Sequence, residues 1–172
     1  MKEPHLGHME SDNAGSYISE PVIVTLFGQA FTFELSQYEG DNDRDAFHQA
    51  IRHFMALEPS ALQQAEAAIF AYYQKINAYF EPDDECYVDI PQASDVWAHI
   101  EWGDRITVMR RPYGDKGIYL LLTAWCAWEE DHGLQMVFKH GKAVNMIGPV
   151  SGRVSHIDAF GDPSLEEVMY SA

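Results

Sequence analysis

The apolar positions of the chain first alternate with polar ones and then recur every three or four residues. Residues 22–27 and 30–35 are two β-rich runs joined by Gly28 and Gln29, a spacing typical of a hairpin with a two-residue turn. In the second run, apolar side chains alternate with polar ones from Phe31 onward. This alternation predicts a strand with one buried face and one solvated face.

Helical spacing follows the hairpin. Apolar positions three or four residues apart predict a helix over residues 43–56. Ser60 with Gln63 three residues later has the pattern of a capping box, so a second helix is expected from residue 60 to residue 79 or 80. Its wide apolar stripe indicates burial against a sheet. Residues 94–102 predict a third, short helix capped by Ser94.

The second half of the chain reads as β-structure. Apolar runs at residues 106–109, 118–128, 134–138 and 143–147 are separated by Gly-containing turns, which predicts an antiparallel meander. The fold class expected is therefore α+β, with an antiparallel sheet made of the N-terminal hairpin and the C-terminal meander. Two or three helices would pack against this sheet.

The length of 172 residues fits one domain. Residues 1–19 mix Gly, Ser, Asn, His and acids without periodicity, so we expect a flexible N-terminal arm followed by a single α+β domain over residues 20–172. Residues 1–16 lack the apolar core of a secretory signal, which predicts a cytoplasmic protein. The apolar run 118–128 is about half the ~20 residues that a membrane-spanning helix needs, so no membrane association is expected.

The net negative charge of the chain limits the kinds of molecule that it is expected to bind. The chain carries 27 acidic and 11 basic side chains, a formal net charge of −16, and 15 of the acids lie in residues 1–86. Nucleic-acid binding relies on clustered Lys and Arg, and the chain offers only the adjacent pair Arg110 and Arg111, so no nucleic-acid partner is expected. An acidic surface favours capture of a basic protein, although it would also serve solubility.

Reaction motifs are missing from the sequence. It contains no phosphate-binding glycine loop, no dinucleotide-binding turn and no Gly-x-Ser-x-Gly nucleophile elbow. Residues 41–45 begin like a calcium loop, but Arg52 occupies the position of the bidentate glutamate. Cys86 and Cys126 lie far apart and are expected to be reduced core thiols. No cofactor and no metal are therefore expected.

One stretch concentrates groups capable of chemistry. It forms the loop between two predicted strands, and we take it as the candidate functional surface, which comprises Trp128, Glu129, Glu130, Asp131 and His132. The first interpretation is a solvated hairpin loop in which Gly133 adopts a positive φ. The alternative is a catalytic or metal site in which His132 is a base or ligand assisted by Glu130 or Asp131. Further ligands for such a site would be His99, His140 and His156, provided that the fold brings them together.

The same stretch carries a resemblance to a known family. Residues 128–135, followed by Phe138, Gly141 and Gly148-Pro149, resemble an uncharacterised bacterial domain family marked by Trp-x-x-Glu-His-Gly-Leu-Gln. The resemblance covers roughly residues 20–170 and implies no established function. Asp131 stands where the family usually has glutamate. Ser151 and Arg153 stand where a family segment would offer an acid and a histidine, so a site built on that pair and His132 would be incomplete here.

Two functions from different classes follow. The leading hypothesis is a non-enzymatic binding module whose acidic surface engages a basic protein partner, and the similarity of small acidic bacterial domains to immunity proteins suggests neutralisation of a toxin. The alternative is a small metal-dependent or hydrolytic enzyme that uses the loop at residues 129–132. A structural subunit of a homo-oligomer is a third reading, and the sequence leaves the oligomeric state open.

Overall fold

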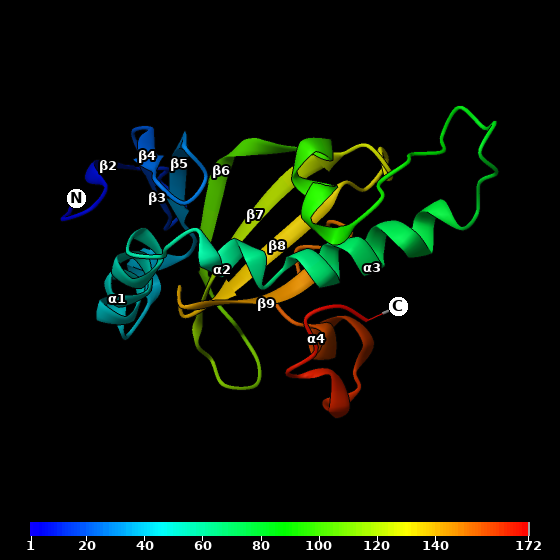
Figure 1. Cartoon of the computed structure of the whole chain (residues 1–172). Coiled ribbons are helices and arrows are strands. Elements are labelled where there is room, and N and C mark those ends of the chain that lie inside the picture. Colours follow the sequence, from blue (N-terminus) through cyan, green and yellow to red (C-terminus); the bar gives the residue numbers. More distant parts are fainter. Residues whose placement is uncertain (172) are drawn as a thin grey trace.

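The computed structural model describes residues 1–171 and places a mixed sheet at the centre of the molecule (Figure 1). Within these residues the sheet has nine strands in the order β1-β2-β3-β5-β6-β7-β8-β9, with β4 paired to β5. Neighbouring strands are antiparallel except β5 and β6, which are parallel. The strands are β1 (Lys2–Glu3), β2 (Gly7–Ser11), β3 (Tyr17–Ser19), β4 (Val22–Val24), β5 (Gln29–Leu35), β6 (Ile100–Arg110), β7 (Ile118–Cys126), β8 (Leu134–Lys139) and β9 (Ala143–Gly148).

Helices cover one face of this sheet. Figure 1 shows α2 and α3 crossing in front of the sheet and α1 to their left, below β4 and β5 in this view, while α4 lies below β9 near the C-terminus. The helices are α1 (Arg44–Met55), α2 (Ser60–Gln63), α3 (Glu66–Asn77) and α4 (His156–Phe160), with 3-10 segments η1 (Tyr38–Gly40), η2 (Ala93–His99) and η3 (Pro163–Leu165). The expected α+β class is confirmed, and the sheet is mostly antiparallel as predicted.

The main core lies between the sheet and the helices. Phe33, Phe47, Phe54 and Phe138 are fully buried there. A smaller cluster on the opposite face of the sheet contains Tyr119, Leu121, Val137, Met146 and Val154. Strand β7 contributes to both clusters, which explains why its sequence is a continuous apolar run instead of an alternating one.

The second predicted helix is interrupted. It forms α2 and α3, separated by Gln64 and Ala65. The proposed capping box is wrong, because Pro59 already has helical angles (φ −53°, ψ −27°) and occupies the cap position, leaving Ser60 inside the helix without a capping hydrogen bond. The apolar stripe is nevertheless buried, at Ala65, Ile69 and Tyr73 among others.

Two further local expectations need correction. The hairpin between β4 and β5 turns over residues 25–28 and not over two residues, because Val24 pairs with Gln29. The short third helix is the 3-10 segment η2, and the chain is extended from Ile100 onward, so Trp102 lies on β6 opposite Ala124. Cys126 is a buried thiol as expected, whereas Cys86 is exposed.

The N-terminal residues differ most from expectation. Residues 1–19 form β1, β2 and β3, which extend the sheet beyond β5. Leu6 and Met9 are buried, and the carboxylate of Glu3 accepts the backbone N–H groups of His5 (2.6 Å) and Leu6 (2.8 Å). The structure thus places short strands where a flexible arm was expected, and Glu3 and Ser19 are buried in these strands together with Met9.

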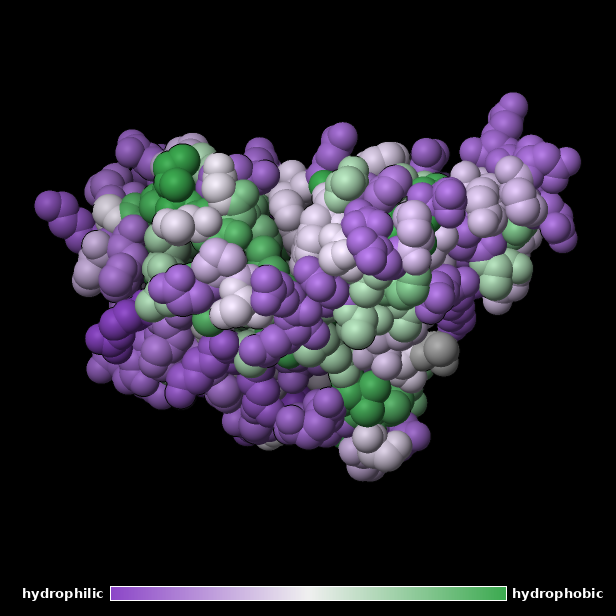
Figure 2. All heavy atoms as spheres, viewed as in Figure 1, coloured by the Kyte–Doolittle hydropathy of each residue, from purple (hydrophilic) through white to green (hydrophobic). Residues whose placement is uncertain are grey.

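The molecular surface on the helical side is largely polar. Figure 2 shows the most apolar residues gathered in separate areas, over the β4–β5 hairpin and beside the C-terminal segment. The loop that projects beyond α3 is mostly hydrophilic. Within residues 1–171, no helix combines the length and apolar character needed to cross a bilayer.

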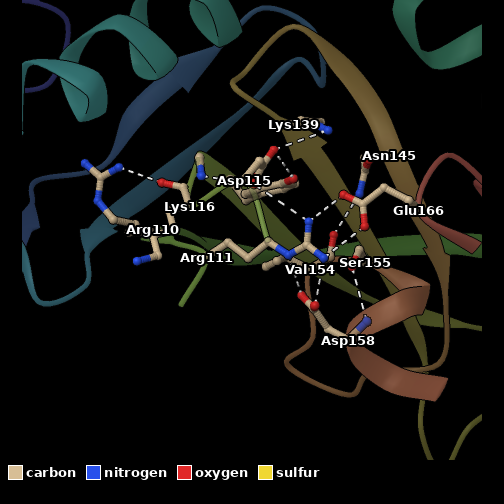
Figure 3. A network of polar contacts seen from close by, with 12 residues as sticks. Arg110, Arg111, Asp115, Lys116, Lys139, Asn145, Val154, Ser155, Asp158 and Glu166 are labelled. Carbon is tan, nitrogen blue, oxygen red and sulfur yellow. Dashed lines mark hydrogen bonds and ion pairs between the residues drawn. The ribbon is translucent and has the colours of Figure 1, made fainter. Parts of the chain in front are cut away.

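A buried arginine fastens the C-terminal segment to the sheet. Arg111 follows β6, is 1% exposed, and lies among carboxylates from two segments (Figure 3). Asp158 on α4 accepts from its Nε and Nη2 at 2.8 Å each, and Glu166 accepts from Nη1 at 2.6 Å and Nη2 at 3.0 Å. Asp115 lies 3.7 Å from Nη1. Residues 155–171 are thus held by charge-assisted hydrogen bonds as well as by packing.

Candidate functional site

The loop between β7 and β8 is tied firmly to its surroundings. The backbone N–H of Gly133 donates to the carbonyl of Glu129 (2.9 Å), and the Tyr72 hydroxyl donates to the carbonyl of Gly133 (3.0 Å). Gly133 has the positive φ expected from the sequence, +61°, and a Cβ at this position would lie 2.5 Å from the Ala124 carbonyl oxygen. Only glycine therefore lets the chain enter β8 at this point.

Glu129 organises the loop. Its Oε1 accepts the backbone N–H groups of Asp131 (3.2 Å) and His132 (3.3 Å), and it lies 3.4 Å from His132 Nδ1. The Glu129 side chain is 19% exposed, whereas that of His132 is 64% exposed. The structure thus brings Glu129 and His132 together, and Glu129 supports the backbone of the loop.

Trp128 belongs to the core and not to the surface on which the sequence places it. Its ring meets Tyr72 and Tyr73 of α3 edge-on, with ring centroids 6.1 Å and 6.0 Å apart. It is 3% exposed, and its indole Nε1 has no hydrogen-bond partner within residues 1–171. Edge-on aromatic contacts of this kind fix the start of the loop against α3.

Two hollows flank the exposed tip of the loop. One, with a volume of about 720 Å³, lies between the loop and the residues that follow α3. The other, of about 400 Å³, lies on the side of Trp125 and Val150, two exposed apolar residues. Glu130 and Asp131 line both hollows, so their carboxylates stand on the ridge between them.

The larger hollow, which we call the α3-loop pocket, includes residues that sequence reasoning missed. It is lined by Ile76, Tyr79, Phe80, Glu85, Cys86, Ala127, Trp128, Glu129, Glu130 and Asp131. In the sequence, residues 81–85 are a run of four acids and a proline, a composition typical of a solvated loop. No local signal could have placed it beside residues 127–131, because that proximity arises only from the packing of α3 on the sheet.

The other histidines have separate surroundings. His140 Nε2 lies 3.8 Å from Asp115, and His156 Nε2 lies 3.0 Å from the carbonyl oxygen of Met169. The His99 carbonyl accepts the N–H of Ala127. The backbone of His99 therefore lies beside the loop, and this contact does not involve its imidazole ring. Over the part of the chain that the structure describes, no three His, Cys, Asp or Glu side chains are arranged to hold a metal ion.

Cys126 is a nucleophilic side chain that contacts the loop. Its Sγ donates weakly to the carbonyl oxygen of Glu129 at 3.6 Å. Burial raises the pKa of this thiol to about 12, so the group stays protonated at neutral pH. A protonated, buried thiol is a core residue and a poor nucleophile.

A family model described as "Domain of unknown function (DUF6985)" matches residues 5–154. The chain belongs to this family. The DUF6985 match includes strands β2 to β9, the loop at residues 127–133 and the α3-loop pocket. No curated protein and no solved structure matches the chain significantly.

The DUF6985 match ends before α4. Asp158 and Glu166 lie beyond the matched residues, whereas their partner Arg111 lies within them. The matched region holds the C-terminal segment through this buried cation and through further contacts, among them the Ile147 N–H, which donates to the carbonyl of Met169 at 2.6 Å.

Proposed function

We propose that this chain is a non-enzymatic protein-binding module of the bacterial cytoplasm, and that its acidic surface engages a basic protein partner. The contact surface is centred on the loop tip, which we define as Glu130, Asp131 and His132. Neutralisation of a basic toxin, in the manner of an immunity protein, is the specific form of this proposal.

The observation that carries the proposal is the setting of Glu130 and Asp131. Both are exposed, both line two hollows, and neither forms a salt bridge with any of residues 1–171. The loop that carries them is fastened by Gly133 and Glu129, so the carboxylates are presented on a rigid base. Rigid presentation lowers the entropy lost on association.

The charge distribution supports the same conclusion. Arg105, Arg110, Arg111 and Lys139 all pair with acidic side chains within the chain. With a net charge of −16, the acids left without an internal partner dominate the surface. Such a surface attracts a basic protein from a distance and repels polyanions.

Affinity capture from the native host tests this proposal. The wild-type chain is compared with Glu130→Gln/Asp131→Asn, which removes two charges without changing side-chain size. The matched control is Glu10→Gln/Glu20→Gln, which removes two exposed charges from the opposite end of the sheet in Figure 1. Captured proteins are identified by mass spectrometry at low and high salt.

The expected result is a basic protein that the wild type and the control retain at low salt. The same protein should be released by salt and lost by the loop variant, because exposed charges are screened beyond ~8 Å at physiological ionic strength. Recovery of no protein, or equal recovery with both variants, would contradict the proposal.

A further inference from the structure

The α3-loop pocket has a buried side and an exposed rim of different chemistry. Trp128 is buried and Phe80 and Ala127 are partly buried, so apolar surface forms the inner wall. Glu85 and Glu130 are exposed at the rim. The volume of about 720 Å³ falls in the ~300–1,000 Å³ range typical of pockets that enclose small ligands.

We infer that this pocket binds one lysine or arginine side chain of the basic protein partner, together with the adjacent backbone. The inference rests on the proposed function and names the group that the partner inserts. Three properties of the pocket support it: its charge, its aromatic wall and its unsatisfied indole.

The charge of the pocket is of one sign. Four carboxylates line it, those of Glu85, Glu129, Glu130 and Asp131, and its lining includes no Lys, Arg or His. Carboxylates around an apolar wall concentrate negative potential inside the hollow. A cation entering it would relieve the mutual repulsion of the carboxylates, whereas an anion or a neutral apolar group would not.

The aromatic wall suits the stem of a basic side chain. Tyr79 is 75% exposed at the pocket, an unusual exposure for so large an apolar ring, and Phe80 lies beside it on the inner side. Lysine and arginine bury their methylene stems on apolar surface while the charged head stays among polar groups. A cation close to the face of a ring also gains electrostatic attraction from it.

The indole of Trp128 favours a peptide over a free cation as the occupant of the pocket. Trp128 lines the pocket, and its buried Nε1–H has no acceptor in the described chain. A buried donor without an acceptor is unfavourable. A peptide that inserts a basic side chain also brings a backbone carbonyl, the kind of acceptor that this N–H lacks, whereas an inorganic cation brings none.

Titration with single-residue probes tests the inference on the full chain. The probes are Nα-acetyl-lysine methylamide, Nα-acetyl-arginine methylamide and the uncharged Nα-acetyl-norleucine methylamide. The readout is the indole N–H resonance of Trp128 in a nitrogen–proton NMR spectrum, assigned by its loss in Trp128→Phe. We expect saturable shifts with the two cations and none with norleucine.

Substitutions in the α3-loop pocket test whether the probes bind there. Affinity for the lysine probe should fall about fivefold in Glu130→Gln/Asp131→Asn, since each exposed ion pair contributes modestly. It should fall about threefold in Tyr79→Leu, which keeps apolar volume but removes the ring. Glu10→Gln/Glu20→Gln should leave the affinity unchanged. Equal shifts with norleucine, or no shift with either cation, would overturn the inference.

A second measurement does not depend on probe affinity. Cys86 is an exposed thiol that lines the pocket, and Cys126 is buried. Relative to a free thiol in solution, Cys86 should favour a cationic methanethiosulfonate over its sulfonate analogue, and this preference should fall in Glu130→Gln/Asp131→Asn without vanishing, because Glu85 still adjoins the thiol. A wild-type Cys86 with the same preference as the free thiol would contradict the inference.

The two proposals can fail separately. If the pocket ignores lysine and arginine but the captured basic protein still depends on Glu130 and Asp131, the basic partner stands and the inserted side chain is wrong. If the pocket binds both cations but no host protein depends on the loop, the binding site stands and the proposed function is wrong.

Discussion

Arg111 and Asp158 form a two-pronged ion pair in which Nε and Nη2 each donate to one carboxylate oxygen at 2.8 Å. The guanidinium is 1% exposed and the Asp158 carboxylate 10% exposed. The planar fork of arginine matches a carboxylate in a way that lysine cannot. Because Arg111 follows β6 and Asp158 lies on α4, this pair joins two parts of the chain 47 positions apart in sequence.

The first prediction concerns the loss of this buried cation. Arg111→Met should destabilise the fold by about 3 kcal/mol, because Asp158 and Glu166 would face each other without a counter-charge. The control is Arg105→Met. The Arg105 side chain, which pairs with Glu34, is 59% exposed, so this substitution should lower the free energy of unfolding by less than about 1 kcal/mol. Urea unfolding measures both. Equal losses in the two variants would show that Arg111 does not fasten the C-terminal segment.

The second prediction concerns the entry into β8. Gly133→Ala should destabilise the fold by about 3 kcal/mol, because the new methyl group meets the Ala124 carbonyl oxygen at 2.5 Å in addition to the strained positive φ. Gly152→Ala is the matched control, with φ +70° and no atom within 4 Å, and should cost only about 1 kcal/mol. Thermal unfolding distinguishes them, and equal costs would remove the steric explanation.

Local patterns predicted much of the fold because the local physics agrees with the tertiary contacts. The helix expected over residues 43–56 is α1, where the Asp43 side chain accepts the Ala46 N–H and the apolar positions are buried. The Gly-containing turn expected between the runs 134–138 and 143–147 joins β8 and β9, and His140 and Gly141 have positive φ there. In each case the cap or turn residue and the apolar spacing indicate the same structure.

Pairings between distant segments were not predictable in this way. The parallel contact of β5 and β6 aligns Phe33 with Ile106, and no local feature of either strand specifies that register. Strands β1 to β3 were missed because their anchoring depends on very few apolar side chains. Short strands of mixed composition carry almost no periodic signal.

In the candidate site, too, the features set by local sequence were predictable and those set by contacts between distant segments were not. The hairpin loop and the positive φ of Gly133 follow from the sequence, and the loop is where the prediction places it. The α3-loop pocket beside it does not follow from the sequence, because Tyr79 and Glu85 lie near the loop only through the packing of α3 on the sheet. Trp128, taken from sequence as part of a surface, is buried because α3 supplies Tyr72 and Tyr73 as neighbours.

The third prediction concerns acid. Asp41 accepts from Arg110 Nε at 2.6 Å and Nη2 at 2.8 Å, and these hydrogen bonds hold the pKa of Asp41 below its ordinary value despite the opposing effect of burial. Because the folded-state pKa is the lower one, the stabilisation is present above the unfolded value of about 3.9 and is lost as pH falls through the folded value. Asp41→Asn should therefore lower stability at neutral pH and flatten its decline below about pH 4.

Urea unfolding at several pH values checks this prediction. Arg110→Met should produce the same flattening, and the double variant should add little to either single one, since the two residues share one interaction. A wild-type curve whose slope below pH 4 matches that of Asp41→Asn would refute the role of this pair.

The fourth prediction tests whether residues 1–19 belong to the folded structure. Met9 is 1% exposed and pairs with Ser19 between β2 and β3, so Met9→Ala should cost about 2–4 kcal/mol through lost burial and the cavity left behind. Ile23→Ala is the control, because Ile23 is a β4 residue of similar size that is 62% exposed, and its truncation should change stability by less than about 0.5 kcal/mol. Chemical unfolding gives both values. If the two variants were equally stable, β2 would contribute nothing to the fold and an N-terminal arm would again describe these residues.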